Sequence, residues 1–241
     1  MIGLGTIINT AGIIVGGLLG HFGGKLLQER HQDGLGKACG ICVLFIGAAG
    51  AMEGLLSLQD GGIVSGRSMF IVVCLALGAL IGELLNIENW FIRFGERLKA
   101  KTGNMKDRWF VDGFVTASLT VSIGAMAIVG SIQDGIFGDW SILGTKAILD
   151  LIIIMVMTCS MGKGCIFSAI PVFVFQGIMT VLARLIRPLM TDAALGNLSL
   201  IGSILIFCVG INLVWGQKIR VANLLPALFL AVAAAFLPFA I

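Results

Sequence analysis

Long apolar segments alternate with short polar ones along the whole chain. A helix rises about 1.5 Å per residue, so about 20 mainly apolar residues cross the roughly 30 Å hydrocarbon core of a bilayer. The sequence contains eight segments of about that length. We therefore predict an all-α, polytopic bundle of about eight transmembrane helices. The approximate ranges are 2–22, 36–58, 67–87, 110–132, 141–160, 164–186, 195–215 and 219–240.

The boundary between the fifth and sixth segments is the weakest point of this prediction. Only Met161-Gly162-Lys163-Gly164 separates the two. These residues can form a tight hairpin between two spans. Alternatively, the two segments form one broken, re-entrant pair, which would leave seven spans.

Composition places the whole chain in a membrane. Of the 241 residues, 58% are hydrophobic and only 12% are charged, whereas a soluble domain carries about 25% charged residues. The polar stretches are too short for a separate soluble domain, so we predict a single transmembrane domain over residues 1–241 with the lipid bilayer as a partner. A net charge of +3 gives no indication of nucleic-acid binding. The 34 glycines predict helices in close contact.

Basic residues gather in alternate loops. With eight spans, the loops after the first, third, fifth and seventh hold 12 of the 16 lysines and arginines. The positive-inside rule then places these loops in the cytoplasm and both termini of this multi-pass protein outside. In one such loop, residues 89–99 combine aromatic and cationic side chains, which predicts either a helix at the membrane interface or a solvated loop. The 12 residues are Lys25, Arg30, Lys37, Arg93, Arg97, Lys99, Lys101, Lys106, Arg108, Lys163, Lys218 and Arg220.

One sequence occurs nearly twice. Residues 50–61 and 124–135 share seven of 12 positions without a gap, and both end in Gln-Asp-Gly. Duplicated segments are typical of transporters, so we interpret the match as an internal repeat. A weaker match between the second and seventh spans suggests another arrangement, in which inverted units 1–87 and 164–240 flank a central pair, 110–160.

Charged residues inside apolar segments are the first candidates for function. Such residues are costly in lipid and usually face the bundle interior or a water-filled cavity. Glu53 lies within the second segment, and Asp150 lies near the middle of the fifth, four residues after Lys146. That spacing places Lys146 and Asp150 on one helix face, where they can form a structural ion pair or part of a polar pathway. Glu53 corresponds to Ala127 in the second repeat copy, so helix packing alone does not require an acid there.

Uncharged polar residues extend this set of candidates. Asn9, Gln176 and Asn212 lie amid apolar neighbours, and Gln133 belongs to the repeated Gln-Asp-Gly. Their amides can line a hydrophilic pathway, or they can only join helices by hydrogen bonds. Two prolines, Pro171 and Pro226, interrupt apolar segments and predict local breaks or kinks there.

Motifs of known enzymes and metal sites are missing from the sequence. His21 and His31 form no HExxH arrangement, and we find no GxSxG, Walker or dinucleotide-binding motif in a suitable context. Most of the six cysteines lie in apolar segments, where a thiol behaves as a small hydrophobe. We therefore expect neither an enzyme nor a bound metal or cofactor.

Five segments together resemble a known family from end to end. The chain is similar to the bacterial integral-membrane proteins grouped as domain of unknown function 554 (YdfK-like). This resemblance implies a bacterial cytoplasmic (inner) membrane and assigns no substrate. The segments are Gly3-Leu4-Gly5-Thr6-Ile7-Ile8-Asn9, residues 124–135, Thr145-Lys146-Ala147-Ile148-Leu149-Asp150, Phe167-Ser168-Ala169-Ile170-Pro171 and residues 219–226.

These observations favour a secondary transporter of a small solute or monovalent cation, coupled to H⁺ or Na⁺. The expected polar pathway contains Glu53, Asp150, Lys146, Asn9, Gln133, Gln176 and Asn212. Two alternatives stay open: an ion channel, and a scaffold or lipid-interacting protein that transports nothing. GxxxG spacings between Gly12 and Gly20 permit close helix contacts within one chain or in a homo-oligomer.

Overall fold

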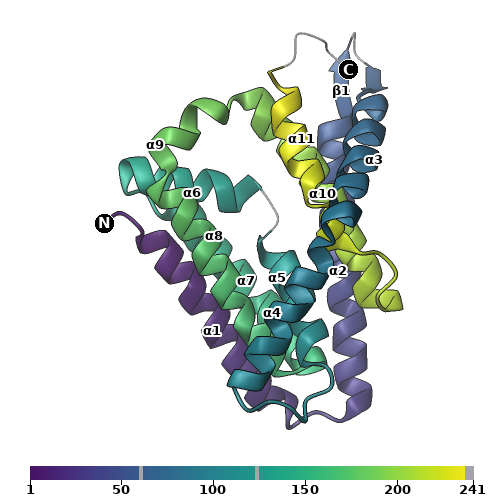
Figure 1. The fold of residues 1–241 in the computed structure, drawn as a ribbon, viewed down its shortest axis with the longest axis vertical. Coiled ribbons are helices and arrows are strands. Elements are labelled where there is room, and N and C mark those ends of the chain that lie inside the picture. The colour runs from purple at the N-terminus through teal and green to yellow at the C-terminus, as the bar shows by residue number, and fades with distance from the viewer. Residues whose placement is uncertain (60–61, 123–124, 237–241) are drawn as a thin grey trace.

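The protein is an all-α bundle, as predicted, and a computed structural model describes residues 1–59, 62–122 and 125–236 (Figure 1). The helices are α1 (Leu4–Gly24), α2 (Glu29–Leu55), α3 (Ser68–Leu85), α4 (Ile87–Lys101), α5 (Phe110–Ser122), α6 (Ala125–Phe137), α7 (Ser141–Met161), α8 (Ala169–Val181), α9 (Ala183–Ile186), α10 (Asp192–Trp215) and α11 (Pro226–Ala234). The 3-10 helices are η1 (Lys163–Ser168), η2 (Arg187–Leu189) and η3 (Val221–Leu224). Strands β1 (Leu56–Gln59) and β2 (Gly62–Ser65) form an antiparallel hairpin after α2.

The described residues contain six helices that are long and apolar enough to cross a membrane. A seventh span results if α5 and α6, whose axes differ by 62°, count as one broken span. The predicted fourth segment is therefore not a straight helix. The predicted eighth segment, 219–240, contains a shorter apolar helix over Val221–Ala234, and residues 237–241 lie outside the described chain.

Glycines at every fourth position of α1 bring its main chain against α7. A Cβ atom placed on Gly12 would lie 2.9 Å from the Ala147 carbonyl oxygen, and the next glycines approach α7 as closely. Residue numbers rise together in both helices, so α1 and α7 are parallel. The GxxxG spacing thus serves contacts within the chain. The facing pairs are Gly12 with Ala147, Gly16 with Leu151, Gly20 with Met155 and Gly24 with Cys159.

Glycines also bring two pairs of antiparallel helices into close contact. Helix α2 packs on α10, and α3 packs on α11. These directions agree with a chain that crosses from one end of the bundle to the other with each successive segment. The pairs are Gly40 with Val214, Gly47 with Phe207 and Gly54 with Leu200, followed by Gly78 with Ala227 and Gly82 with Asn223.

The bundle has two groups of helices with α5 between them (Figure 1). Helices α1, α6, α7 and α8 form one group, and α2, α3, α10 and α11 form the other. Of the 13 residues of α5, 10 are buried. We call the end where α1 ends and α2 begins the basic end, because most lysines and arginines lie there. Helix α4, which covers the segment predicted to be amphipathic, packs on α5, with Gly95 against Phe114.

The two predicted proline breaks are helix starts rather than kinks. Pro171 lies in the first turn of α8 after η1, and Pro226 is the first residue of α11 after η3. A proline there removes no helical hydrogen bond, since the first amides of a helix have no partner within it. Both 3-10 segments follow a glycine in the left-handed region, Gly162 (φ 85°) and Gly216 (φ 79°). Each of the hairpins α7–η1–α8 and α10–η3–α11 thus has a positive-φ glycine directly after its first helix, but Gly162 also directly precedes η1, whereas residues 217–220 separate Gly216 from η3.

The duplicated sequence does not share one local structure. In the first copy, the segment Leu56–Gln59 is strand β1, whereas the matching residues 130–133 lie within α6. The ends of the first copy at residues 60 and 61, and the start of the second at Gly124, lie outside the described residues. The internal repeat therefore stays a prediction from the sequence.

Candidate functional site

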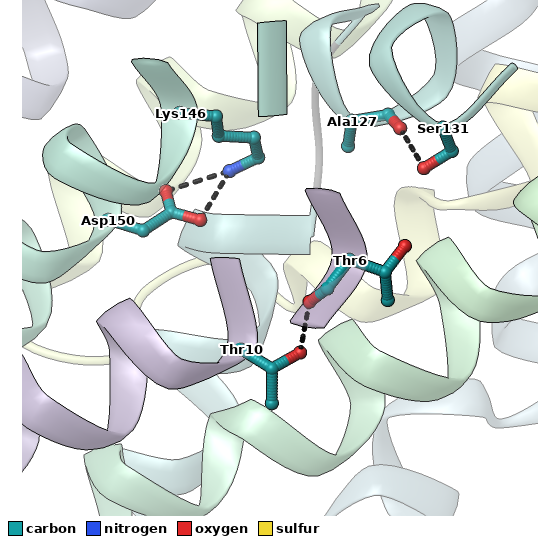
Figure 2. Close-up of polar contacts among 6 residues, drawn as sticks. All are labelled: Thr6, Thr10, Ala127, Ser131, Lys146 and Asp150. Atoms are coloured by element: carbon teal, nitrogen blue, oxygen red, sulfur yellow. Dashed lines mark hydrogen bonds and ion pairs between the residues drawn. The ribbon is translucent and has the colours of Figure 1, made fainter. Parts of the chain in front are cut away.

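A buried ion pair lies on α7, between the helices of the first group. The Nζ atom of Lys146 is 2.7 Å and 2.6 Å from the two carboxylate oxygens of Asp150 (Figure 2). The exposed fractions of Lys146 and Asp150 are 8% and 3%. The predicted pairing on one helix face is confirmed. Because neither charge has much access to solvent, each depends on the other for compensation.

Asn9 of α1 lies beside this pair. Its exposed fraction is 0%, and its amide lies next to the Asp150 carboxylate. Within the described chain, neither Nδ2 nor Oδ1 of Asn9 has a hydrogen-bond partner. Leaving a buried donor or acceptor unpaired costs about 1–3 kcal/mol. The neighbouring Asp150 carboxylate can accept only from Nδ2, so Oδ1 in particular needs a donor from elsewhere.

Gln176 of α8 is a second buried amide of this kind. It is also 0% exposed, and neither Nε2 nor Oε1 finds a partner among the residues that the structure describes. The hydroxyls of Thr6 and Thr180 are 3.3 Å apart and join α1 to the antiparallel α8. Asn9 and Gln176 lie about one turn from these two threonines, on the same side along the helix pair. We call Asn9, Lys146, Asp150 and Gln176 the interior polar cluster.

The hydroxyls around this cluster are mostly occupied by their own helices. Thr10 donates to the Thr6 carbonyl (2.7 Å) and Ser131 to the Ala127 carbonyl (2.6 Å), as Figure 2 shows. Such bonds within one helix satisfy the hydroxyl without fixing a neighbouring helix. Among the described residues of this cluster, the amides of Asn9 and Gln176 are therefore the groups without a hydrogen-bond partner.

Asp134, which we did not predict as a site residue, caps the first helix. Its carboxylate accepts hydrogen bonds from the backbone N–H groups of Gly3 (3.2 Å) and Gly5 (2.9 Å), and it is fully buried. The first amides of a helix need such acceptors, and a negative charge there is favourable. The adjoining Gln133 is half-buried on α6, and its predicted role in a pathway stays a prediction.

Glu53 does not lie inside the bundle as expected. It is exposed in the last turn of α2, at the end opposite the basic end. The neighbouring glycines, Gly50 and Gly54, face Ser203 and Leu200 of α10, and Glu53 lies on the face of α2 that α10 leaves uncovered. The expected interior position of Glu53 was therefore wrong.

Asn212 has a structural role that accounts for all its polar atoms. Its Nδ2 donates to the Gln217 Oε1 (3.1 Å) and to the Ile219 carbonyl (2.7 Å). Its Oδ1 accepts from the backbone N–H groups of Lys218 and Ile219, both at 2.9 Å. Asn212 thus holds the turn between α10 and η3.

Replacing Asn212 with leucine should lower the free energy of unfolding by roughly 1–3 kcal/mol, since two backbone N–H groups lose their acceptor. Chemical denaturation in detergent measures this change. Asn89→Ala, at an exposed position of α4, is the control and should stay within about 0.5 kcal/mol of the parent. An N212L variant as stable as the control would contradict the structural role.

Two cavities open at the basic end. The larger, of about 560 Å³, is lined by Glu83, Asn86, Glu88, Asn89, Ile92, Asp112, Val115, Gln217, Lys218, Ile219 and Arg220. The smaller, of about 220 Å³, includes His21, Lys25, Gln32 and Asp107. Among the described residues, no group of three or more His, Cys, Asp or Glu side chains could hold a metal ion.

Comparisons with known proteins agree with a membrane protein. The sequence profile of the family described as "Protein of unknown function (DUF554)" matches residues 4–236. The uncharacterized membrane protein YdfK of Bacillus subtilis (strain 168) is 29% identical over 227 residues, which cover 94% of this chain and 93% of YdfK. The uncharacterized protein YqgA of Escherichia coli (strain K12) is 28% identical over 232 residues, covering 95% and 94% of the two chains. No solved structure matches this chain significantly.

Proposed function

The chain belongs to the family described as "Protein of unknown function (DUF554)", and we propose that this membrane protein is a secondary transporter of a small hydrophilic solute or monovalent cation. The observation that carries the proposal is two buried amides without partners in the described chain, Asn9 beside the Lys146–Asp150 pair and Gln176 on the facing helix α8. Four buried polar atoms without partners among the described residues are costly, and a ligand or water that binds them recovers that free energy.

Broken helices near the cluster support this proposal. Transporter sites are commonly formed near the middle of the bilayer by discontinuous helices. The interrupted ends of these helices offer free backbone groups. Here the described part of α5 reaches Ser122, whose buried hydroxyl has no partner in the described chain. Helix α6 then continues at 62° to α5 and packs against α7 and α8.

The ion pair offers a means of coupling. Protonation of Asp150, or the approach of Na⁺ to its carboxylate, would weaken its hold on Lys146 and change the charge beside Asn9. Binding of a cation and of a solute would thus affect one set of side chains. In this scheme the cluster is exposed alternately to the two sides of the membrane.

The proposed orientation places the basic end in the bacterial cytoplasm and both termini outside. The excess of lysine and arginine at one end supports this orientation under the positive-inside rule. The parallel pair α1–α7 and the antiparallel pairs α2–α10 and α3–α11 fit the alternation that it requires.

One observation favours the rival function, a membrane scaffold. The Lys146–Asp150 pair neutralises itself, and Asn212 only holds a turn, so these residues alone need no ligand. The two functions differ in what they predict for Gln176. A scaffold gains nothing from an unpaired amide in its core.

Replacing Gln176 with leucine should therefore stabilise the protein and abolish transport. The substitution removes an unpaired buried amide, which should raise the free energy of unfolding by about 1–3 kcal/mol. In proteoliposomes, H⁺ flux followed with an internal pH dye and uptake of ²²Na⁺ and of radiolabelled polar solutes should fall at least about tenfold.

Gln28→Ala, at an exposed position before α2, is the matched control for a lost amide and should change neither quantity. A Q176L protein that is more stable and transports as the parent does would favour the scaffold. A Q176L protein that is less stable would show that the amide has a partner, and the site would lose its main support.

A further inference from the structure

A water-sized chamber lies directly inside the larger cavity of the basic end. The chamber has a volume of about 10 Å³ and shares Glu88, Val115 and Gln217 with that cavity. Its inner wall includes Thr116 and Leu119 of α5. A volume of this size holds about one water molecule. The two cavities thus follow one another from the basic end toward the centre of the bundle.

The oxygen atoms around the chamber are mostly engaged already. Gln217 donates from Nε2 to the Thr116 hydroxyl (3.1 Å) and accepts at Oε1 from Asn212 (3.1 Å). The Asn212 Oδ1 accepts two backbone N–H groups. A bare cation needs several free oxygens to replace its hydration shell. The chamber therefore suits water and not a dehydrated metal cation.

Glu88 is the carboxylate at the junction of the two cavities. Its Oε2 accepts from the Ala222 N–H (3.0 Å), and its own backbone N–H donates to the Asn223 Oδ1 (2.7 Å). These two bonds join α4 to η3 and hold the Glu88 side chain in place. Glu88 lines both the larger cavity and the chamber.

The charges around Glu88 come from several elements. Glu83 of α3, Asp112 of α5, and Lys218 and Arg220 before η3 line the same cavity. Burial raises the pKa of Glu88 and the nearby Glu83 adds to this, whereas the bond from Ala222 and the charge of Arg220 act in the opposite direction. A raised pKa brings the carboxyl closer to the pH range in which it exchanges protons with water.

We propose that Glu88 transfers protons between the basic-end cavity and the single water of the inner chamber. A hydronium ion in the cavity gives its proton to the Glu88 carboxylate and becomes water. The carboxylic acid then gives this proton to the chamber water, which becomes hydronium, and the carboxylate is restored. Thr116 and Thr120, one turn apart on α5, continue the polar face away from the basic end. The inference rests on the proposed transport function in one respect, since it makes H⁺ the coupling ion.

The chamber water can be tested without any transport assay. Hydroxyl radicals made by radiolysis of water in lipid nanodiscs oxidise side chains that touch bound water. Leu119, which lines the chamber, should be oxidised at least about fivefold faster than Leu205, which is fully buried on α10. Equally slow oxidation of both leucines would overturn the proposal.

The role of Glu88 is tested by infrared spectroscopy as the pH is varied. The parent should show a protonated-carboxyl band that disappears with a midpoint above that of an ordinary glutamate. Glu88→Gln, which keeps an oxygen for the Ala222 N–H, should lose this band, and Glu96→Gln, at an exposed position of α4 outside both cavities, should retain it. An unchanged band in E88Q would refute the assignment.

Proton flux separates this inference from the proposed function. Flux in parent vesicles that E88Q reduces at least about tenfold, with E96Q unaffected, supports both. Oxidation of Leu119 and the Glu88 band, with no flux of H⁺, ²²Na⁺ or polar solute in the parent, would refute the transporter and leave the water path standing. Flux that is equal in the parent and E88Q would overturn the proton role of Glu88 alone.

Discussion

Replacing Asp150 with leucine should destabilise the protein by about 3–5 kcal/mol, because it leaves a buried charge uncompensated. The Nζ atom of Lys146 lies 2.6 Å from the Asp150 carboxylate, and both side chains are almost fully buried. Lys146→Met should be similarly harmful, since it leaves the carboxylate without its cation. Unfolding by urea or SDS, followed by helix content, measures the loss for each single variant.

The double variant Lys146→Met with Asp150→Leu separates structure from function. Replacing a buried ion pair with apolar side chains of similar volume is often neutral or stabilising, so the double variant should recover most of the stability. We expect it to fold and to transport at least about tenfold more slowly than the parent. Lys37→Met with Asp33→Leu, which removes an exposed pair at the same spacing, is the matched control.

A double variant that folds and transports as the parent does would show that the pair is only structural. A single Asp150→Leu variant as stable as the parent would contradict the buried pairing itself. The first outcome would contradict the role of the pair in transport, and the second would contradict its place in the fold.

The second large effect is expected at Gly16. Gly16→Ala places a methyl group against the main chain of Leu151 on α7, where backbone atoms cannot move aside. The parallel helices α1 and α7 would have to separate, and we expect a loss of about 3 kcal/mol, at the upper end of what overpacking costs. Thermal unfolding in detergent, followed by circular dichroism, measures this loss.

Gly23 of the same helix provides the control, since no atom of the described chain lies within 4 Å of a Cβ placed there. Gly23→Ala should be neutral or stabilising by up to about 1 kcal/mol, because alanine is the better helix former. If Gly16→Ala were as well tolerated as Gly23→Ala, the close α1–α7 contact would be wrong.

Local spacing explains which parts of this structure could be predicted. The Lys146–Asp150 pair was predictable because a separation of four residues fixes one helix face, whatever the tertiary structure. The glycines of α1 predicted a close contact in the same way. Their partner, α7, could not be predicted, because a small-residue face does not specify which helix it meets.

Contacts distant in sequence explain what was missed. Asp134 caps α1 from 129 residues away at Gly5, and nothing in the local sequence marks that pairing. Glu53 was expected inside because its segment is apolar, but its orientation depends on which face of α2 the distant α10 covers. The 62° angle between α5 and α6 was also missed, because no proline in residues 110–137 marks a break in that apolar segment.

The most direct test of the account is a high-resolution density map of the protein in lipid nanodiscs around Asn9 and Gln176. We expect non-protein density, from water or a solute, within hydrogen-bond distance of both amides and beside the Lys146–Asp150 pair. A map in which both amides bond only to protein groups, with nothing else enclosed among α1, α7 and α8, would contradict it.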